Sequence, residues 1–73
     1  MPNPHRRFLI LLGNKIRKER EKRGLSQEEF GTLAKFHRTY IGMIERGEKN
    51  ITLQNMAKFA QALNVNVRDL IEF

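Results

Sequence analysis

The chain contains no cysteine and no tryptophan, and it has only two histidines and two prolines. Without cysteine it can form no disulfide and offers no thiolate to a metal, and two distant histidines are too few for a dedicated metal site. The lack of cysteine leaves the redox compartment open and is compatible with a reducing cytoplasm. We therefore expect no metal and no cofactor.

Long hydrophobic runs are absent as well. The longest, at residues 8–12, has five residues, far fewer than a bilayer span needs. Basic residues precede it, so the start of the chain superficially resembles a secretory signal. The run is too short for one, and no small-residue cleavage site follows. We assign it to the first helix and expect no association with a membrane.

Motifs of catalysis are missing too. There is no glycine-rich phosphate loop, no nucleophile elbow and no His-Glu metalloprotease motif. The paired carboxylates Glu19/Glu21 and Glu28/Glu29 fall on basic helices that we expect to be exposed. Glu28 and Glu29 also open a helix, where negative charge is favourable for purely structural reasons. The sequence therefore does not indicate an enzyme.

Positive charge is what the chain has in excess. Fourteen Lys and Arg face eight Asp and Glu, for a net charge of +6 and a pI near 10.3. Such a balance favours a polyanionic partner, either nucleic acid or an anionic membrane surface. The length of 73 residues predicts one small domain, residues 1–73, with a modest core.

Helical periodicity and capping signals cover the chain, and no strand pattern is present. They predict an all-α fold, a compact five-helix bundle. Gly24 and Gly47 fit left-handed residues after the first and third helices, and Asn64 fits one after the fourth. The first expected helix runs from residue 4 to about residue 23. Two short helices begin at residue 27 and at about residue 38. The fourth runs from residue 53 to about residue 63, and the last covers residues 67–72.

The stretch from Ser26 to Arg46 reads as two short helices joined by a tight turn. Ser26 and Glu29 form a capping box, the apolar stripe of the first short helix includes Leu33, and the turn falls at residues 35–37. A helix–turn–helix on a basic chain indicates DNA binding, with the second helix in the major groove. Alternatively, the amphipathic start of the chain, residues 6–16, could lie on a membrane surface.

The second short helix should read bases with the residues that its core face does not need. If Ile41 and Ile44 face inward, Arg38, Thr39, Gly42 and Met43 face outward. Arg38 can present its fork to guanine, Thr39 can hydrogen-bond or touch thymine, and Met43 offers apolar contact. We expect DNA backbone contacts from the flanking residues Gln27, His37, Tyr40, Arg46, Lys49 and Asn50.

Two further helices carry apolar stripes. The first helix should face the core with Leu9, Leu12 and Ile16, but Phe8, Ile10 and Leu11 cannot all share that face. Either the first helix is buried on two sides or this patch meets a second subunit, and we favour burial on two sides. The stripe of the fourth helix is interpreted as core and comprises Leu53, Met56, Phe59, Ala60 and Leu63.

Three segments carry a family resemblance: GLSQEEF at 24–30, HRTYIGMIERGEKN at 37–50 and TLQNMAKFAQALNVNVRDL at 52–70. From about residue 12 onward the chain resembles the Cro/CI-type helix–turn–helix transcriptional regulators, most closely the controller proteins of restriction–modification systems. The resemblance implies a cytoplasmic, nucleoid-associated homodimer that binds double-stranded DNA at an inverted-repeat operator. It implies base reading by Arg38, Thr39 and Met43, and an ion pair between Arg20 and Glu45. It also implies dimerisation through the last helices, at Val67, Leu70, Ile71 and Phe73.

The chain departs from the family pattern at three positions. Glu19 stands where an apolar residue is usual, so we expect looser packing of the first helix. Gly31 replaces a usual alanine inside a helix, a loss of about 1 kcal/mol. Lys35 stands where the turn commonly has glycine, so a left-handed backbone there would be strained.

Other readings stay open. The chain could be an antitoxin-like autoregulator that binds a protein toxin, although we expect no disordered tail to occupy the toxin. Contact with RNA polymerase is a further partner that the sequence leaves open, as are the operator and the target genes.

Overall fold

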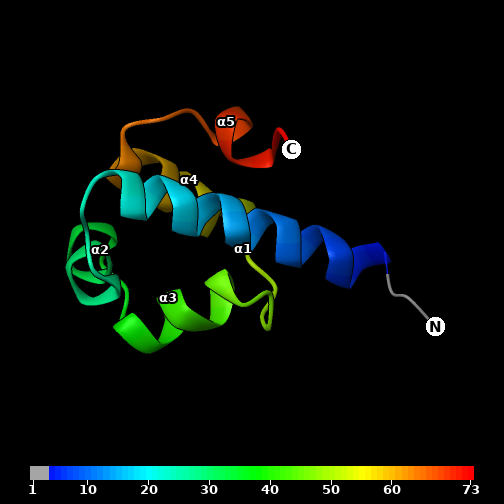
Figure 1. Cartoon of the computed structure of the whole chain (residues 1–73), viewed down its shortest axis with the longest axis horizontal. Helices are drawn as coiled ribbons and strands as arrows, with labels where there is room; N and C mark the ends of the chain where they lie inside the picture. Colours follow the sequence, from blue (N-terminus) through cyan, green and yellow to red (C-terminus); the bar gives the residue numbers. More distant parts are fainter. Residues whose placement is uncertain (1–3) are drawn as a thin grey trace.

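The computed structural model describes residues 4–73, which form five helices and, over that range, no strand. The prediction of an all-α fold is confirmed. The helices are α1 (Pro4–Lys22), α2 (Gln27–Ala34), α3 (Arg38–Glu45), α4 (Leu53–Leu63) and α5 (Val67–Ile71). In Figure 1, α1 crosses the middle of the molecule, with α3 on one side of it and α5 on the other.

The helix ends follow from local capping. Ser26 Oγ accepts the Glu29 backbone N–H at 2.9 Å, and the Glu29 carboxylate accepts the Ser26 backbone N–H at 2.8 Å. Thr52 Oγ1 accepts the Asn55 N–H at 3.0 Å at the start of α4. Left-handed residues follow the helices, with φ of 69° at Gly24, 71° at Gly47 and 58° at Asn64. These signals explain why the helix bounds were predictable.

The core joins all five helices. Phe30 of α2 stacks on Phe59 of α4 with ring centroids 5.4 Å apart. The largest fully buried side chains are Phe30, Phe59, Leu12, Ile16, Ile41, Leu63 and Leu70. Because Leu70 lies in this core, it presents no surface to a second subunit, and the interface residue inferred from the resemblance is corrected here.

Two leucines expected in the core lie outside it. Leu33 is 56% exposed and Leu53 is 71% exposed. Phe30 and Ala34 fill the space beneath α2, and the later turns of α4 supply the buried residues of that helix. Helical spacing identified the apolar face of each helix, but it did not identify which residues the neighbouring helices cover.

The apolar patch on α1 is exposed. Phe8, Ile10 and Leu11 all remain accessible, so the expectation that α1 is buried on two sides is wrong. The ring of Phe8 instead contacts Phe73, with centroids 5.6 Å apart. Ile71 is exposed as well. The start of α1 and the end of the chain therefore form one apolar surface.

Glu19 is buried, contrary to the expected exposed face. Its carboxylate accepts Arg23 Nη1 at 2.9 Å and lies 3.4 Å from Lys22 Nζ and 3.7 Å from Lys15 Nζ. The hydrogen bond from Arg23 is the main cause that holds the pKa of Glu19 below its usual value. Ion pairs thus take the place of the apolar packing that the family resemblance led us to expect. No helix within residues 4–73 has the length and apolar character to cross a bilayer.

Candidate nucleic-acid interface

The turn between α2 and α3 sets their relative orientation. Lys35 ends α2 with a left-handed backbone, φ 64°, and the Phe36 N–H donates to Gly31 O at 2.8 Å. A Cβ on Gly31 would lie 2.5 Å from Phe36 O, closer than such atoms approach. Gly31 is therefore required by the close turn, and the simple cost expected from helix propensity is a misinterpretation of its role.

His37 caps the first turn of α3. Its Nδ1 accepts the Thr39 backbone N–H at 3.0 Å. A ring nitrogen that accepts a hydrogen bond carries no proton, so the neutral ring has its proton on Nε2. This leaves an N–H donor at the solvent side of the helix N-terminus.

The inner side of α3 is held against α1. Ile41 and Ile44 are buried. A Cβ on Gly13 of α1 would lie 2.4 Å from Ile44 O and 2.6 Å from Glu45 O. The absence of a side chain at Gly13 thus lets the two helix backbones approach directly.

A buried ion pair also joins these helices, as the resemblance implies. Arg20 Nε donates to Glu45 Oε2 at 2.7 Å and Nη2 donates to Oε1 at 3.0 Å. The side chains of Arg20 and Glu45 are 10% and 2% exposed. Arg20 Nη1 donates to Leu25 O at 2.7 Å, and Gln27 Nε2 donates to Glu45 Oε1 at 3.1 Å. The bond to Glu45 is the main cause that raises the pKa of Arg20, which stays charged.

The outer side of α3 presents the expected base readers. Arg38 and Thr39 are exposed and Met43 is half-buried. The Arg38 side chain is 66% exposed, with Nη1 3.7 Å from Glu28 Oε2. Arg38 and Thr39 border a hollow of about 320 Å³ between α2 and α3, which is completed by Gln27, Gly42 and Arg46.

Gly42 does not face solvent as expected. It is buried, and a Cβ there would lie 3.0 Å from Arg46 Nη1 and 3.6 Å from Gln27 Oε1. The two long side chains therefore cover the glycine from outside. Gln27 lies 15 positions before Gly42 and Arg46 lies four positions after it. Helical spacing within α3 therefore does not reveal that these side chains cover the glycine.

Side chains around α3 form a polar flank. Tyr40 is half-buried, its hydroxyl accepts Asn55 Nδ2 at 3.0 Å, and Lys49 Nζ lies 5.9 Å from its ring centroid. Asn50 Oδ1 lies 2.6 Å from His5 Nε2, which ties the first turn of α1 to the loop after α3. Of the residues predicted to contact the DNA backbone, Gln27 and Arg46 line the same hollow as the predicted base readers Arg38 and Thr39.

Arg46 and Glu48 form a bidentate pair at the end of α3. Arg46 Nε donates to Glu48 Oε2 at 2.8 Å, and Nη2 donates to Oε1 at 3.1 Å. The pair raises the pKa of Arg46 and holds the pKa of Glu48 below its usual value. Glu48 was not among the site residues predicted from the sequence. Its position two residues after an arginine was the available signal.

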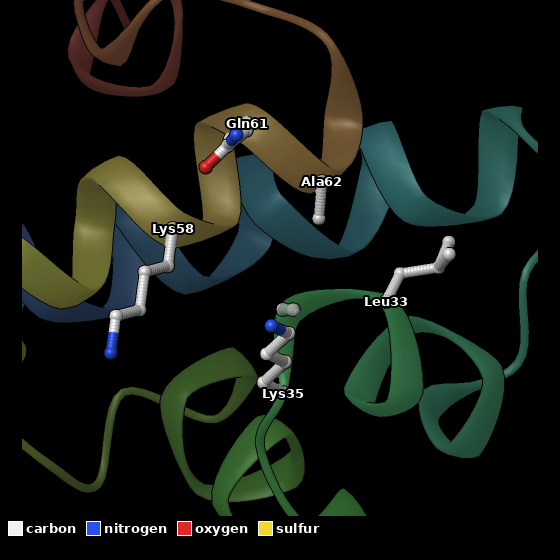
Figure 2. Close-up of a pocket in the computed structure, with 6 residues that line it drawn as sticks. Leu33, Lys35, Lys58, Gln61 and Ala62 are labelled. Atoms are coloured by element: carbon white, nitrogen blue, oxygen red, sulfur yellow. The ribbon is translucent and has the colours of Figure 1, made fainter.

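A second hollow, of about 480 Å³, lies between the end of α2 and α4. Figure 2 shows Leu33 and Lys35 on one side of it and Lys58, Gln61 and Ala62 of α4 on the other. None of the predicted site residues lines this hollow.

Comparisons with known proteins agree with this geometry. A family model described as helix-turn-helix matches residues 16–70. Control protein C.BamHI of Bacillus amyloliquefaciens is 43% identical over 65 residues, which are 88% of this chain and 80% of that protein. The crystal structure of the restriction-modification controller protein C.AhdI from Aeromonas hydrophila superposes with a TM-score of 0.88 at 38% identity, covering 93% of this chain and 99% of that one. The biofilm master regulator SinR, solved in complex with DNA, gives a TM-score of 0.79 at 29% identity over 84% and 98% of the two chains.

Proposed function

The chain belongs to the helix-turn-helix family whose model spans residues 16–70, and we propose that it is a sequence-specific regulator of transcription that binds double-stranded DNA. Its likeness to the C.BamHI and C.AhdI controllers supports control of restriction–modification genes in the cytoplasm, by binding and without catalysis. One observation carries the proposal: α3 is held on its inner side by α1, while its outer side presents Arg38 and Thr39.

Base reading is assigned to the outer side of α3. Arg38 lies in the first turn and is exposed, so its fork can reach guanine O6 and N7 in a major groove. Thr39 is exposed beside it and can hydrogen-bond a base or touch a thymine methyl. Met43, half-buried one turn later, supplies apolar contact at the edge of the site.

Phosphate contacts are assigned to the flank. The neutral His37 ring has a donor on Nε2, because Nδ1 accepts from Thr39. The Tyr40 hydroxyl accepts from Asn55 and can still donate its own proton to a phosphate. The full set of flanking contacts is Gln27, His37, Tyr40, Lys49 and Asn50. Arg46 differs from these five because its guanidinium forms a bidentate pair with Glu48.

A homodimer would read two half-sites about one helical turn, ~34 Å, apart on one face of the duplex. The exposed apolar surface of Phe8, Ile71 and Phe73 supports a subunit interface at this end of the molecule. Val67, half-buried in α5, can contribute to it. Leu70 is excluded because it lies in the core.

The proposal is tested by selecting bound duplexes from a random pool and measuring affinity by fluorescence anisotropy. The selected sequence should be an inverted repeat. Arg38→Ala should lose about 1–3 kcal/mol of discrimination at one base pair of each half-site. The control Lys49→Ala should weaken binding to all duplexes similarly. It should also reduce the slope of log affinity against log salt concentration by about one. Equal losses by Arg38→Ala on selected and random duplexes would contradict the assignment.

A further inference from the structure

The Arg46 guanidinium is fixed on two of its edges. Glu48 engages Nε and Nη2 with its two oxygens, at 2.8 and 3.1 Å. The third nitrogen, Nη1, lies over Gly42, where a Cβ would approach it to 3.0 Å. Arg46 is the C-cap residue of α3, and its backbone N–H donates to Gly42 O at 3.1 Å. Two separate features, the carboxylate and the missing side chain, therefore determine where the guanidinium lies.

The net charge of the Arg46–Glu48 pair contributes little to affinity for a DNA backbone. A phosphate contact gains affinity chiefly from the positive charge that it brings, because that charge releases counterions. Glu48 cancels the charge of Arg46 locally, and ion pairing keeps Glu48 ionised by lowering its pKa. A carboxylate beside DNA also repels the phosphates. An arrangement that only neutralised phosphates would be improved by the loss of Glu48.

Directional hydrogen bonding gives the pair a different value. A guanidinium has five N–H donors, one on Nε and two on each terminal nitrogen. Glu48 uses the Nε–Nη2 edge. The edge formed by Nη1 and Nη2 still carries donors, and two parallel donors are what guanine O6 and N7 require. This edge belongs to a residue that lines the same hollow as Arg38 and Thr39.

We propose that Arg46 is a specificity-determining residue that reads a guanine edge, and that Glu48 is the positioning residue that holds its guanidinium across Gly42. The inference rests on the proposed function, since it requires a duplex against α3. It differs from the expectation drawn from the sequence, in which Arg46 contacts only the backbone. Gly42 takes part because any side chain there would displace the guanidinium.

The test compares Glu48→Gln, Arg46→Ala and the double variant on three kinds of duplex: the selected operator, a series of operators each changed at one guanine, and a random sequence. Glu48→Gln should bind random duplex more tightly because a negative charge is removed. Its preference for the operator should fall about tenfold, with the loss confined to one guanine position. Arg46→Ala should lose discrimination at the same position, and Glu48→Gln should add nothing to that loss in the Arg46→Ala background.

Gly42→Ala provides an independent variant that should fold, because alanine favours a helix more than glycine does. It should lose discrimination at the same guanine while its urea midpoint stays level or rises. Lys49→Ala is the matched control, a neighbouring cation that should weaken all three duplexes alike. Its operator preference should stay unchanged.

The inference is overturned if Glu48→Gln tightens binding to operator and random duplex by the same factor, since Glu48 would then only repel phosphates. It is also overturned if discrimination survives in Gly42→Ala. If the unmodified chain enriches no sequence from the pool, the proposed function fails as well. A selective chain with unaltered discrimination in both variants refutes this assignment alone.

Discussion

Removing the Glu45 carboxylate would leave the Arg20 guanidinium buried without its partner. The two side chains are 10% and 2% exposed and share two hydrogen bonds. Breaking a buried pair by removing one member costs about 3–5 kcal/mol. Arg20 would keep its bond to Leu25 O, so we expect Glu45→Ala to cost about 3 kcal/mol, at the low end of that range.

This cost is large for so small a chain. At about 0.05–0.15 kcal/mol per residue, 73 residues imply a total of about 4–11 kcal/mol. Glu45→Ala should therefore lower the melting temperature by about 12–24 °C, from about 4–8 °C per kcal/mol for a domain of this size. Urea unfolding followed by circular dichroism, at one fixed protein concentration, measures the loss and keeps dimerisation constant.

Two comparisons separate burial from charge. Glu21→Ala breaks the exposed Arg17–Glu21 pair, whose charged atoms are 3.6 Å apart, and should cost at most about 0.5 kcal/mol. The double variant Arg20→Met/Glu45→Met removes both buried charges and should be clearly more stable than the sum of its single changes predicts. A Glu45→Ala cost near that of Glu21→Ala, or simple additivity in the double variant, would refute the reasoning.

Three shorter predictions concern other parts of the chain. Lys35→Gly should raise the free energy of unfolding by about 1 kcal/mol, because glycine takes the left-handed backbone at φ 64° without strain. The urea midpoint should therefore rise, and an unchanged or lower midpoint would contradict this. Gly13→Ala should destabilise by about 2 kcal/mol or more, since its Cβ would meet Ile44 O at 2.4 Å, and full stability would show that α1 can shift freely. The lowered pKa of Glu19 means that its stabilising ion pairs are complete above its usual pKa of 4.5 and are lost as pH falls through the lowered value. The deficit of Glu19→Gln in urea midpoint should therefore be fully present at pH 7 and should shrink as the pH falls below 4.5, and a deficit constant with pH would count against the ion pairs.

Local signals made the helix bounds predictable. The Ser26–Glu29 capping box and the left-handed residues Gly24 and Gly47 act within a few residues, so the sequence alone contains them. The turn at residues 35–37 was also predictable, whereas the left-handed backbone at Lys35 was only considered as a condition raised by the family resemblance. The outward position of Arg38 and Thr39 followed once Ile41 and Ile44 were assigned to the core.

Contacts between distant residues were not predictable in this way. Propensity treated Gly31 as a weak point, yet its missing side chain is what lets Phe36 O approach. The family resemblance placed Leu70 in an interface although it is core, and the spacing within the five-residue α5 was too short to show which of its apolar residues face inward. Gly42 was placed outward because nothing in its own segment shows that Gln27 and Arg46 cover it.

These distant contacts give α1 a role beyond filling the core. It meets the end of α3 at three levels: Arg20 pairs with Glu45, Gly13 lies against the carbonyls of Ile44 and Glu45, and the Ile10 backbone would lie 2.9 Å from a Cβ on Gly47. All three contacts hold the C-terminal end of α3, whereas Arg38 stands at its N-terminal end, away from them. Because α3 is a single short helix, a shift at its C-terminal end also changes the position of its N-terminal end, so changes at these contacts should alter stability and base discrimination together. A change at Arg38 should alter discrimination alone, and that contrast distinguishes residues that position α3 from residues that read with it.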